Sequence, residues 1–466
     1  LKNNIVHIMV RTFLSIKFDD FFNDSYAEVY FENKILNRNG GGRDNLTPQV
    51  YWEKYKNNTP LILCKCKNEE YRFSSYKEQL ISRGRWKFPR CISIPTVRDR
   101  FVLGLLYEYL KEMFPECVNH CTPNQYIKQI KKYIDKNSEP ICFFKSDFSN
   151  FYNNINQKVL IDKLKQRIHD SRPLKLITDA IQNPTTGFVK EMYVRSCVGI
   201  PQGLAISNIL ASIYMMDFDE RMGTIGSGLY LRYVDDILLL RPHFDNIQQV
   251  ISEYLVENNM SIFLSNDKTV QGRIGDVPLD YIGYVFKKNC ITIRERNVDL
   301  FIRRLARVVT ELRRQLENRV IRPKFISTDK QLVEYYTEEI NELVSGMKYE
   351  NIMYGWLPYF QECTDLQLFH RLDKILKKML SKIPNVVFSN IHSFVDSYYD
   401  IRQRSGIHYV RDYDSLQAIP EKESFLRRKG WIVESKQYSE DSINQFYKEY
   451  CNRRKRALER NIGYFN

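Results

Sequence analysis

The segment LYLRYVDDILLL, at residues 229–240, restricts the possible folds more than any other part of the sequence. Two apolar, β-like runs flank Asp235 and Asp236, which predicts a hairpin with both aspartates between its strands. Carboxylates buried at such a point without partners would be costly, whereas solvated aspartates are common in turns. Taken alone, the pair therefore favours a solvated turn.

A third aspartate changes this interpretation. The apolar run at 141–144 predicts a strand that ends in Lys145-Ser146-Asp147. If the two strands lie side by side, three carboxylates meet at one end of a sheet and repel one another unless they bind cations. Mg²⁺ prefers one or two carboxylates together with substrate phosphates, and two ions roughly 3.5–4 Å apart can serve phosphoryl transfer. The residues therefore predict metal-dependent nucleotidyl transfer.

The net charge is compatible with a nucleic-acid partner. The 466 residues include 70 Lys and Arg against 56 Asp and Glu, giving +14. A polyanionic partner and a solvated basic surface both agree with this balance. No apolar run is long enough to span a membrane, and we expect no secretory signal at the N-terminus. The ten cysteines lack zinc-site spacing, so we expect reduced thiols of a cytosolic protein.

The order of expected elements predicts an α+β domain followed by helices. A helix should begin with Thr47 as N-cap and Pro48 at its first position. We expect further helices over 96–115, 157–168 and 205–222, β-like pieces at 61–66 (LILCKC) and 71–76 (YRFSSY), and a strand over 279–286. Three amphipathic helices should follow over 297–320, 327–347 and 364–383. The last 80 residues give no clear pattern.

Six segments within residues 87–286 resemble the motifs of reverse transcriptases, in the order of that family. They are PRCISIPTVRDR (89–100), SDFSNFY (146–152), GIPQGLAISN (199–208), YVDD (233–236), NDKT (266–269) and LDYIGY (279–284). YVDD resembles the YxDD motif, although its valine stands where many bacterial enzymes carry alanine. A four-residue motif recurs by chance, so the resemblance rests on the other five motifs being present in the same order.

Weaker similarity extends the resemblance to residues 35–385. GGRD (41–44) is similar to an N-terminal segment of intron-type enzymes, and YGWLPYF (354–360) is similar to a stretch of their thumb. There is no HNH endonuclease motif, no paired-cysteine zinc site and no VTG-like segment of retron enzymes. By elimination, the chain most resembles the bacterial defence-associated and abortive-infection reverse transcriptases, which are anti-phage enzymes with an α-helical C-terminal extension.

This resemblance implies a right-hand polymerase fold of the α+β class, with fingers, a palm carrying an antiparallel sheet and helices, and a helical thumb. The expected domains are 1–135 (N-terminal region and fingers), 136–296 (palm), 297–385 (thumb) and 386–466 (a mostly α-helical extension of unknown fold).

The resemblance also assigns the catalytic roles. Asp147 and Asp235 would hold two Mg²⁺ ions, with Asp236 beside them as a ligand or a supporting residue. The Phe148 carbonyl would complete one metal shell. Lys268 would protonate or steady the leaving pyrophosphate, unless it is a surface lysine.

The nucleotide site would use residues from several of these motifs. Tyr152 would lie against the sugar and exclude a 2′-hydroxyl, and its alternative role is that of a core tyrosine. Gln202 would contact the nucleotide, and Arg90 would bind the triphosphate, because a guanidinium matches phosphate oxygens. Lys87 and Arg85 are further candidates, or part of a solvated basic face. Ser207 and Asn208 should cap or pack the palm helix.

Basic residues near the C-terminus are candidates for RNA contact. On the expected thumb helix they are Arg303, Arg304, Arg307, Arg313 and Arg314, of which the first, third and fifth share one side. In the tail they are residues 453–456 (RRKR) and Arg460. Solvated faces would explain both sets equally well.

The leading hypothesis is a reverse transcriptase in the bacterial cytoplasm that serves phage defence with a structured non-coding RNA. Its partners would be RNA, the DNA product, dNTPs and either a second copy of the chain or a defence protein, with no membrane. An untemplated or protein-primed polymerase of the same fold is one alternative. A retron-type or intron-type mobile-element enzyme and a non-catalytic RNA-binding scaffold are the others.

Overall fold

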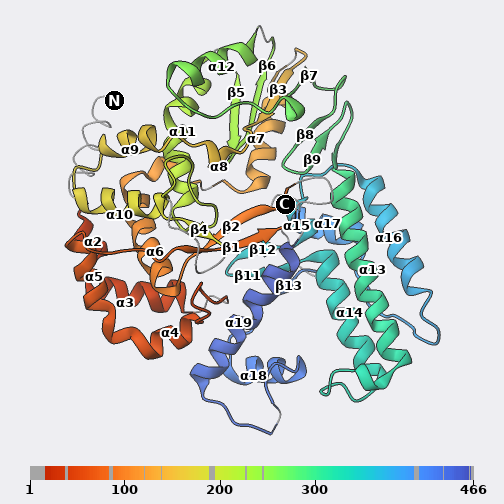
Figure 1. The fold of residues 1–466 in the computed structure, drawn as a ribbon. Helices are drawn as coiled ribbons and strands as arrows, with labels where there is room; N and C mark the ends of the chain where they lie inside the picture. Colours follow the sequence, from red (N-terminus) through yellow and green to blue (C-terminus); the bar gives the residue numbers. More distant parts are fainter. Residues whose placement is uncertain are drawn as a thin grey trace. The chain divides into compact units, whose positions relative to one another are not determined.

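The computed structural model describes residues 16–462, apart from 37–39, 83–87, 120, 138, 188–194, 226–227, 244–245, 404–408, 434 and 461. The chain forms two compact units. Unit 1 combines Leu1–His120 with Ile141–Gly272, and unit 2 combines Cys121–Pro140 with Arg273–Asn466. Sheets and helices are mixed in unit 1 and helices predominate in unit 2, which confirms the α+β class (Figure 1). The division into four domains stays a prediction.

Helices form the N-terminal part of unit 1. They are α2 (Phe18–Phe21), α3 (Asp24–Tyr30), η1 (Phe31–Ile35), α4 (Pro48–Tyr55), η2 (Lys56–Asn58), α5 (Thr59–Lys67), α6 (Val97–Met113) and η3 (Pro115–Cys117). The predicted start of α4 is confirmed, because the Thr47 side chain accepts a hydrogen bond from the N–H of Val50 at 3.3 Å. Thr96 caps α6 in the same way, through the N–H of Asp99 at 3.1 Å.

The prediction of β structure at 61–66 is wrong, because these residues lie in α5. A short apolar run fits a strand or a buried helix equally well. Here Ile62, Leu63 and Cys66 are buried, and their spacing of one and four residues defines one face of a helix. The piece at 71–76 is also irregular until Tyr76, where the first strand begins.

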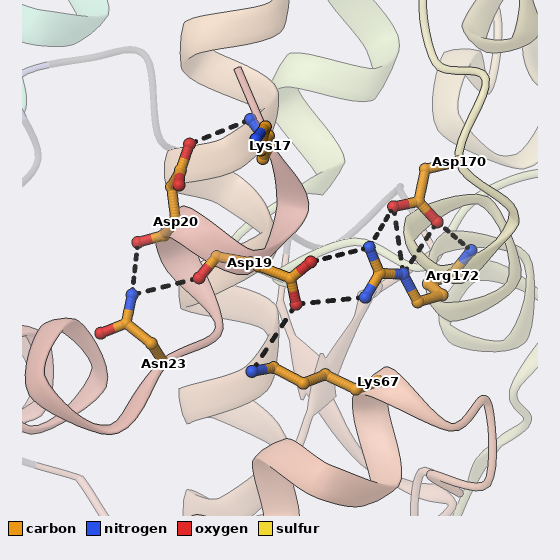
Figure 2. Close-up of polar contacts among 7 residues, drawn as sticks. All are labelled: Lys17, Asp19, Asp20, Asn23, Lys67, Asp170 and Arg172. Carbon is orange, nitrogen blue, oxygen red and sulfur yellow. Dashed lines mark hydrogen bonds and ion pairs between the residues drawn. The ribbon is translucent and has the colours of Figure 1, made fainter. Parts of the chain in front are cut away.

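Arg172 ties α2 to α10 (Ser171–Gln182), as Figure 2 shows. Its guanidinium donates to Asp19 at 2.9 and 3.1 Å, and to Asp170, the N-cap of α10, at 2.7–3.1 Å. The ammonium of Lys67 lies 3.6 Å from Asp19. The hydrogen bond from Arg172 is the main reason why the pKa of Asp19 lies below its ordinary value.

A three-stranded sheet joins the two sequence segments of unit 1. Its order is β2 (Arg90–Ile94), β1 (Tyr76–Ile81) and β4 (Thr185–Thr186), with β1 antiparallel to β2 and parallel to β4. Arg43 of the GGRD segment supports it by donating to the Tyr76 carbonyl at 2.8 Å and the Thr186 hydroxyl at 3.0 Å. This early motif therefore holds the sheet together.

A four-stranded sheet forms the centre of the other part of unit 1 (Figure 1). Its order is β5 (Leu229–Tyr233), β6 (Asp236–Arg241), β3 (Cys142–Asp147) and β7 (Val270–Arg273). Residues 237–240 of β6 are fully buried, which explains their unbroken apolar run. The remaining elements are α8 (Phe151–Asn154), α9 (Gln157–Lys165), α11 (Ser207–Thr224), α12 (Ile247–Glu257) and η4 (Asn266–Lys268), so the helices predicted over 157–168 and 205–222 are confirmed.

In unit 2, the single strand predicted over 279–286 is a hairpin. Its strands are β8 (Leu279–Tyr281) and β9 (Tyr284–Phe286), and β10 (Ile291–Ile293) completes a three-stranded sheet. Ile282 and Gly283 form the turn with φ of 49° and 83°. Positive φ at both central residues suits the twist of a two-residue hairpin, and glycine adopts it without strain.

The three amphipathic helices predicted after residue 297 are confirmed. They are α13 (Glu295–Glu317), α14 (Asp329–Ser345) and α16 (Leu366–Leu380), and α13 lies beside α14 (Figure 1). The shorter helices of this region are α7 (Pro123–Lys136), η5 (Arg319–Ile321) and α15 (Trp356–Tyr359).

The C-terminal residues form a folded, mostly helical extension. Its elements are α17 (Phe394–Gln403), β13 (Arg411–Asp412), α18 (Ile419–Arg428) and α19 (Glu440–Glu459), and β13 pairs with the hairpin β11 (Met347–Tyr349) and β12 (Ile352–Tyr354). Arg454 of α19 is buried in ion pairs with Glu339 and Glu342 of α14. Within the described part of the chain, we find no helix with the length and apolar character to cross a membrane.

Candidate active site

Three aspartates meet at one end of the four-stranded sheet. The antiparallel register of β3 and β6 places Asp147, the last residue of β3, opposite Asp236, the first residue of β6. Asp235 lies in the turn between β5 and β6, and its carbonyl accepts a hydrogen bond from the N–H of Phe148 at 3.1 Å. The structure thus brings together the carboxylates that the strand ends predicted.

The turn that carries Asp235 is strained. Val234 has φ of 61°, in the left-handed region that a β-branched residue rarely adopts. Such a conformation costs of order 1–3 kcal/mol and persists only where its surroundings hold it. One such contact is the hydrogen bond from Arg232 Nη1 to the Val234 carbonyl, at 2.8 Å.

The carboxylates repel one another. Asp147 is buried, with 6% of its surface exposed. Burial, followed by the charges of Asp147 and Asp236, raises the pKa of Asp235 to about 7. Two lysines partly offset this negative charge: Lys268 forms an ion pair with Asp147, and Lys145 Nζ lies 3.9 Å from Asp236.

The residues fit a cation that takes few protein ligands. Among the described residues, no three His, Cys, Asp or Glu side chains gather closely enough to enclose a metal ion. Mg²⁺ needs no such cage, because it keeps several waters and binds through one or two carboxylates plus substrate phosphates. Asp147 and Asp235 are in hydrogen-bond contact, and the raised pKa of Asp235 marks a place where negative charge lacks compensation. The pair therefore suits Mg²⁺.

Tyr152 is near these carboxylates. Its pKa is raised to about 12, first by burial and then by the charge of Asp235. Its hydroxyl donates to Asn208 Oδ1 at 2.7 Å, at the start of α11. Ser207 instead donates to the Pro201 carbonyl at 2.6 Å, so its expected packing role agrees with the structure. Asn208 instead accepts a hydrogen bond from Tyr152, a candidate nucleotide-site residue. We had expected Asn208 only to cap or pack the palm helix.

The GIPQG loop is bound to its surroundings through its backbone. The N–H of Ser93, on β2, donates to the Gln202 carbonyl at 2.7 Å. Gly203 has φ of 101°, and a Cβ there would lie 2.6 Å from the Ile92 side chain. This close approach requires glycine. The loop therefore packs on the strand that begins with Arg90.

The remaining nucleotide candidates differ in how they are placed. The charge of Arg90 acts on Tyr152, lowering its pKa against the effect of burial. The Phe148 side chain is buried in the core, and because a phenyl ring has no ligating atom, only the Phe148 carbonyl could serve as a ligand. Lys87 and Arg85 lie outside the described residues.

Sequence reasoning missed Lys145 and Arg232. Each is a charged residue within an apolar strand, and alternation places Lys145 on the same face as Asp147. A charged residue that interrupts an apolar strand was the sequence feature that could have pointed to Lys145 and Arg232. The partner of Arg232, Asp219 on α11, could not be read from the sequence, because only the fold brings the two together.

The basic residues of unit 2 divide into two groups. Four of those on α13 are exposed: Arg303, Arg307, Arg313 and Arg314. Arg304 is instead half-buried and donates to the Leu458 carbonyl at 3.0 Å. Arg454 is fixed between glutamates of α14. As RNA contacts, the predictions for Arg304 and Arg454 are corrected, because their guanidinium groups bind the protein itself.

Comparisons with known proteins agree with this geometry. Residues 82–286 match the family described as "Reverse transcriptase (RNA-dependent DNA polymerase)". The chain is 27% identical over 165 residues to the "Uncharacterized 91 kDa protein in cob intron" of Schizosaccharomyces pombe, which covers 34% of this chain and 20% of that protein. It is 40% identical over 58 residues to telomerase reverse transcriptase of Mus musculus, covering 12% and 5%.

Solved telomerase structures are also similar. Telomerase from Candida albicans with a TWJ fragment of telomeric RNA gives a TM-score of 0.43 at 13% identity, over 88% of this chain and 67% of that one. Apo telomerase from Candida tropicalis gives 0.41 at 13% identity, over 86% and 74%. The chain spans about a fifth of the length of the intron protein and a twentieth of that of the mouse telomerase.

The four-stranded sheet that ends in paired carboxylates lies within residues 82–286, the segment that matches the reverse transcriptase family.

Proposed function

We propose that this protein is an RNA-directed DNA polymerase that adds dNTPs to a growing DNA strand on an RNA template. The observation that carries the proposal is the meeting of Asp147, Asp235 and Asp236 at the sheet end within the reverse transcriptase segment. The pKa of Asp235, about 7, supports it, because such repulsion is relieved when a cation binds.

Asp147 and Asp235 would hold two Mg²⁺ ions, with Asp236 beside them and the Phe148 carbonyl as a further ligand. The ions would supply the electrostatic stabilisation of the attacking and leaving oxygens. Lys268, which pairs with Asp147, is within reach of the same site and would steady or protonate the pyrophosphate as it leaves.

The nucleotide would be held by groups from β2, α8 and the GIPQG loop. Tyr152, anchored through its hydroxyl to Asn208, would present its ring to the sugar and exclude a 2′-hydroxyl. Arg90 would bind the triphosphate, and Gln202 would contact the nucleotide from a loop whose backbone is fixed to β2.

The test is to incubate the full chain, with its co-purified RNA, with Mg²⁺ and four labelled dNTPs, and to sequence the product. We expect DNA complementary to the RNA, lost in Asp235→Ala and kept in the control Asp162→Ala, which alters an exposed aspartate of α9. Repetitive DNA, or DNA that enters a gel only after protease treatment, would favour an untemplated or protein-primed polymerase. DNA from none of the proteins would contradict polymerase activity.

We further propose a role in phage defence, in the bacterial cytoplasm, with a structured non-coding RNA. The motif resemblance and the folded C-terminal extension support this role. Phage plaque counts on bacteria that express the chain should fall, and Asp235→Ala should restore them. Unchanged counts would contradict the role in defence.

An intron-type enzyme is the second candidate, because 165 residues are similar to a protein encoded in the cob intron. Copies of the chain's gene inside an intron would favour it.

A further inference from the structure

We infer that Arg232, held by Asp219, is the positioning residue that aims the Asp235 carboxylate. This inference rests on the proposed function and deepens it, since it concerns how the same site is kept in working geometry. Neither residue belongs to the motifs that resemble the family's metal ligands or nucleotide contacts.

Asp219 fixes the guanidinium of Arg232 at two points. Asp219, on α11, accepts hydrogen bonds from Nε at 2.7 Å and from Nη2 at 2.5 Å. The Tyr230 hydroxyl, two residues along the same strand, donates to the same carboxylate at 2.6 Å. The Arg232 side chain is 11% exposed and that of Asp219 is 30% exposed, so the guanidinium is the better shielded of the two groups. A planar group bound at two points has little freedom to rotate.

The third guanidinium nitrogen of Arg232, Nη1, binds the turn that carries Asp235. With Nε and Nη2 fixed by Asp219, Nη1 of Arg232 points at the turn and donates to the Val234 carbonyl at 2.8 Å. Val234 is in the left-handed conformation, at φ of 61°, and needs outside contacts to stay there. Arg232 supplies a charged, rigidly held donor at that point.

Asp235 lies between two peptide groups that are each held by a hydrogen bond. The peptide before it is held by Arg232 through the Val234 carbonyl. The peptide after it is held by the Phe148 N–H, which donates to the Asp235 carbonyl at 3.1 Å. Pinning both peptides restricts the backbone angles of Asp235 and hence the direction of its side chain. Groups that orient a metal ligand in this way commonly affect metal affinity or activity 10- to 100-fold when changed.

The role is tested with Arg232→Lys, which keeps a positive charge but lacks the fork that spans the carboxylate and the carbonyl. Tyr230→Phe is the matched control, because it removes a hydrogen bond to the same Asp219 and leaves the Arg232–Val234 contact in place. Four quantities are measured in the full chain: the Kd of Mn²⁺ by titration without substrate, the Kd of RNA, and kcat and KM for dNTP incorporation.

We expect Arg232→Lys to raise the Kd of Mn²⁺ and lower kcat by about 10- to 100-fold each, with KM for dNTPs and RNA affinity within about threefold of wild type. Tyr230→Phe should leave the Kd of Mn²⁺ and kcat within about twofold of wild type. Values for Arg232→Lys equal to those of Tyr230→Phe would overturn the inference, since the ion pair would then serve only to pack α11 on the sheet.

A second variant keeps the test decisive if Arg232→Lys does not fold. Asp219→Glu retains the ion pair but moves the guanidinium away from the turn, so it should give the same loss of Mn²⁺ affinity and kcat. Unchanged values in a folded Asp219→Glu would also overturn the inference. If the wild type binds Mn²⁺ but makes no DNA, the proposed function fails, while the Mn²⁺ affinities still decide the role of Arg232.

Discussion

Replacing Asp235 by asparagine is expected to stabilise the metal-free protein at neutral pH. The pKa of Asp235 is about 7, against an ordinary 3.8, because the carboxyl is buried and faces Asp147 and Asp236. Between these values the folded protein binds a proton that the unfolded chain has released, so the stability falls as the pH rises through this window. Asparagine has nearly the same shape without the charge and removes this loss.

The expected size follows from the pKa. A rise of about 3 pH units, at about 1.4 kcal/mol each, amounts to about 4 kcal/mol above pH 7. The new amide must replace a hydrogen bond beside Asp147, which costs about 1 kcal/mol. We therefore expect Asp235→Asn to raise the free energy of unfolding of unit 1 by about 3 kcal/mol at pH 8, and by close to nothing at pH 4.5. For domains of this size the gain at pH 8 corresponds to roughly 6–12 °C in Tm.

The assay is calorimetric unfolding in EDTA at pH 4.5, 6 and 8. Asp162→Asn, which changes a 57% exposed aspartate of α9, is the matched control and should leave Tm within about 1 °C of wild type. Added Mg²⁺ should raise the Tm of the wild type more than that of Asp235→Asn, because binding to the folded state stabilises it. A variant no more stable than wild type at pH 8, or a gain that is equal at all three pH values, would refute the reasoning.

Three further changes test other parts of the structure. Tyr152→Ala should reduce the preference for dNTPs over rNTPs about 10- to 100-fold in single-turnover incorporation, while Tyr152→Phe, which keeps the ring, should change it little. Arg172→Ala should cost about 1 kcal/mol at pH 7, because Asp19 and Arg172 are partly exposed. Since the pKa of Asp19 is lowered, this difference in Tm should persist above pH 4 and vanish as the pH falls through that pKa. Arg454→Leu should destabilise unit 2 by about 3–5 kcal/mol, because it leaves Glu342 buried without its partner, and limited proteolysis should then cut the extension.

Much of the candidate site could be predicted because its residues mark the ends of regular elements. An apolar run that stops at an aspartate is a strand end, and antiparallel pairing then brings Asp147 to Asp236. Contacts between side chains distant in the sequence leave no pattern in it that predicts them. The sequence places Arg232 on a strand and Asp219 on a helix, but their pairing depends on how α11 packs against the sheet.

The same limit applies to the basic residues. Neighbouring arginines of one cluster have unlike surroundings, since Arg454 is buried between glutamates whereas Arg453 and Arg456 are exposed. Composition counts these charges alike, although only exposed ones can reach a phosphate. The error at 61–66 has a related cause, because a six-residue segment lacks the length that separates a strand from a helical face.

The candidate site combines several unfavourable features, and the surrounding structure explains how they persist. Asp147, Asp235 and Asp236 lie at the same end of the sheet, and the turn that carries Asp235 includes a valine with φ of 61°. Both features lie where β3 ends and where β5 turns into β6; residues 237–240 of β6 are fully buried, and β6 pairs in continuous register with β3 and with β5. A rigid, well-packed sheet can hold these carboxylates together at a cost in stability, which the raised pKa of Asp235 reflects. A cation bound by these carboxylates would relieve part of that cost.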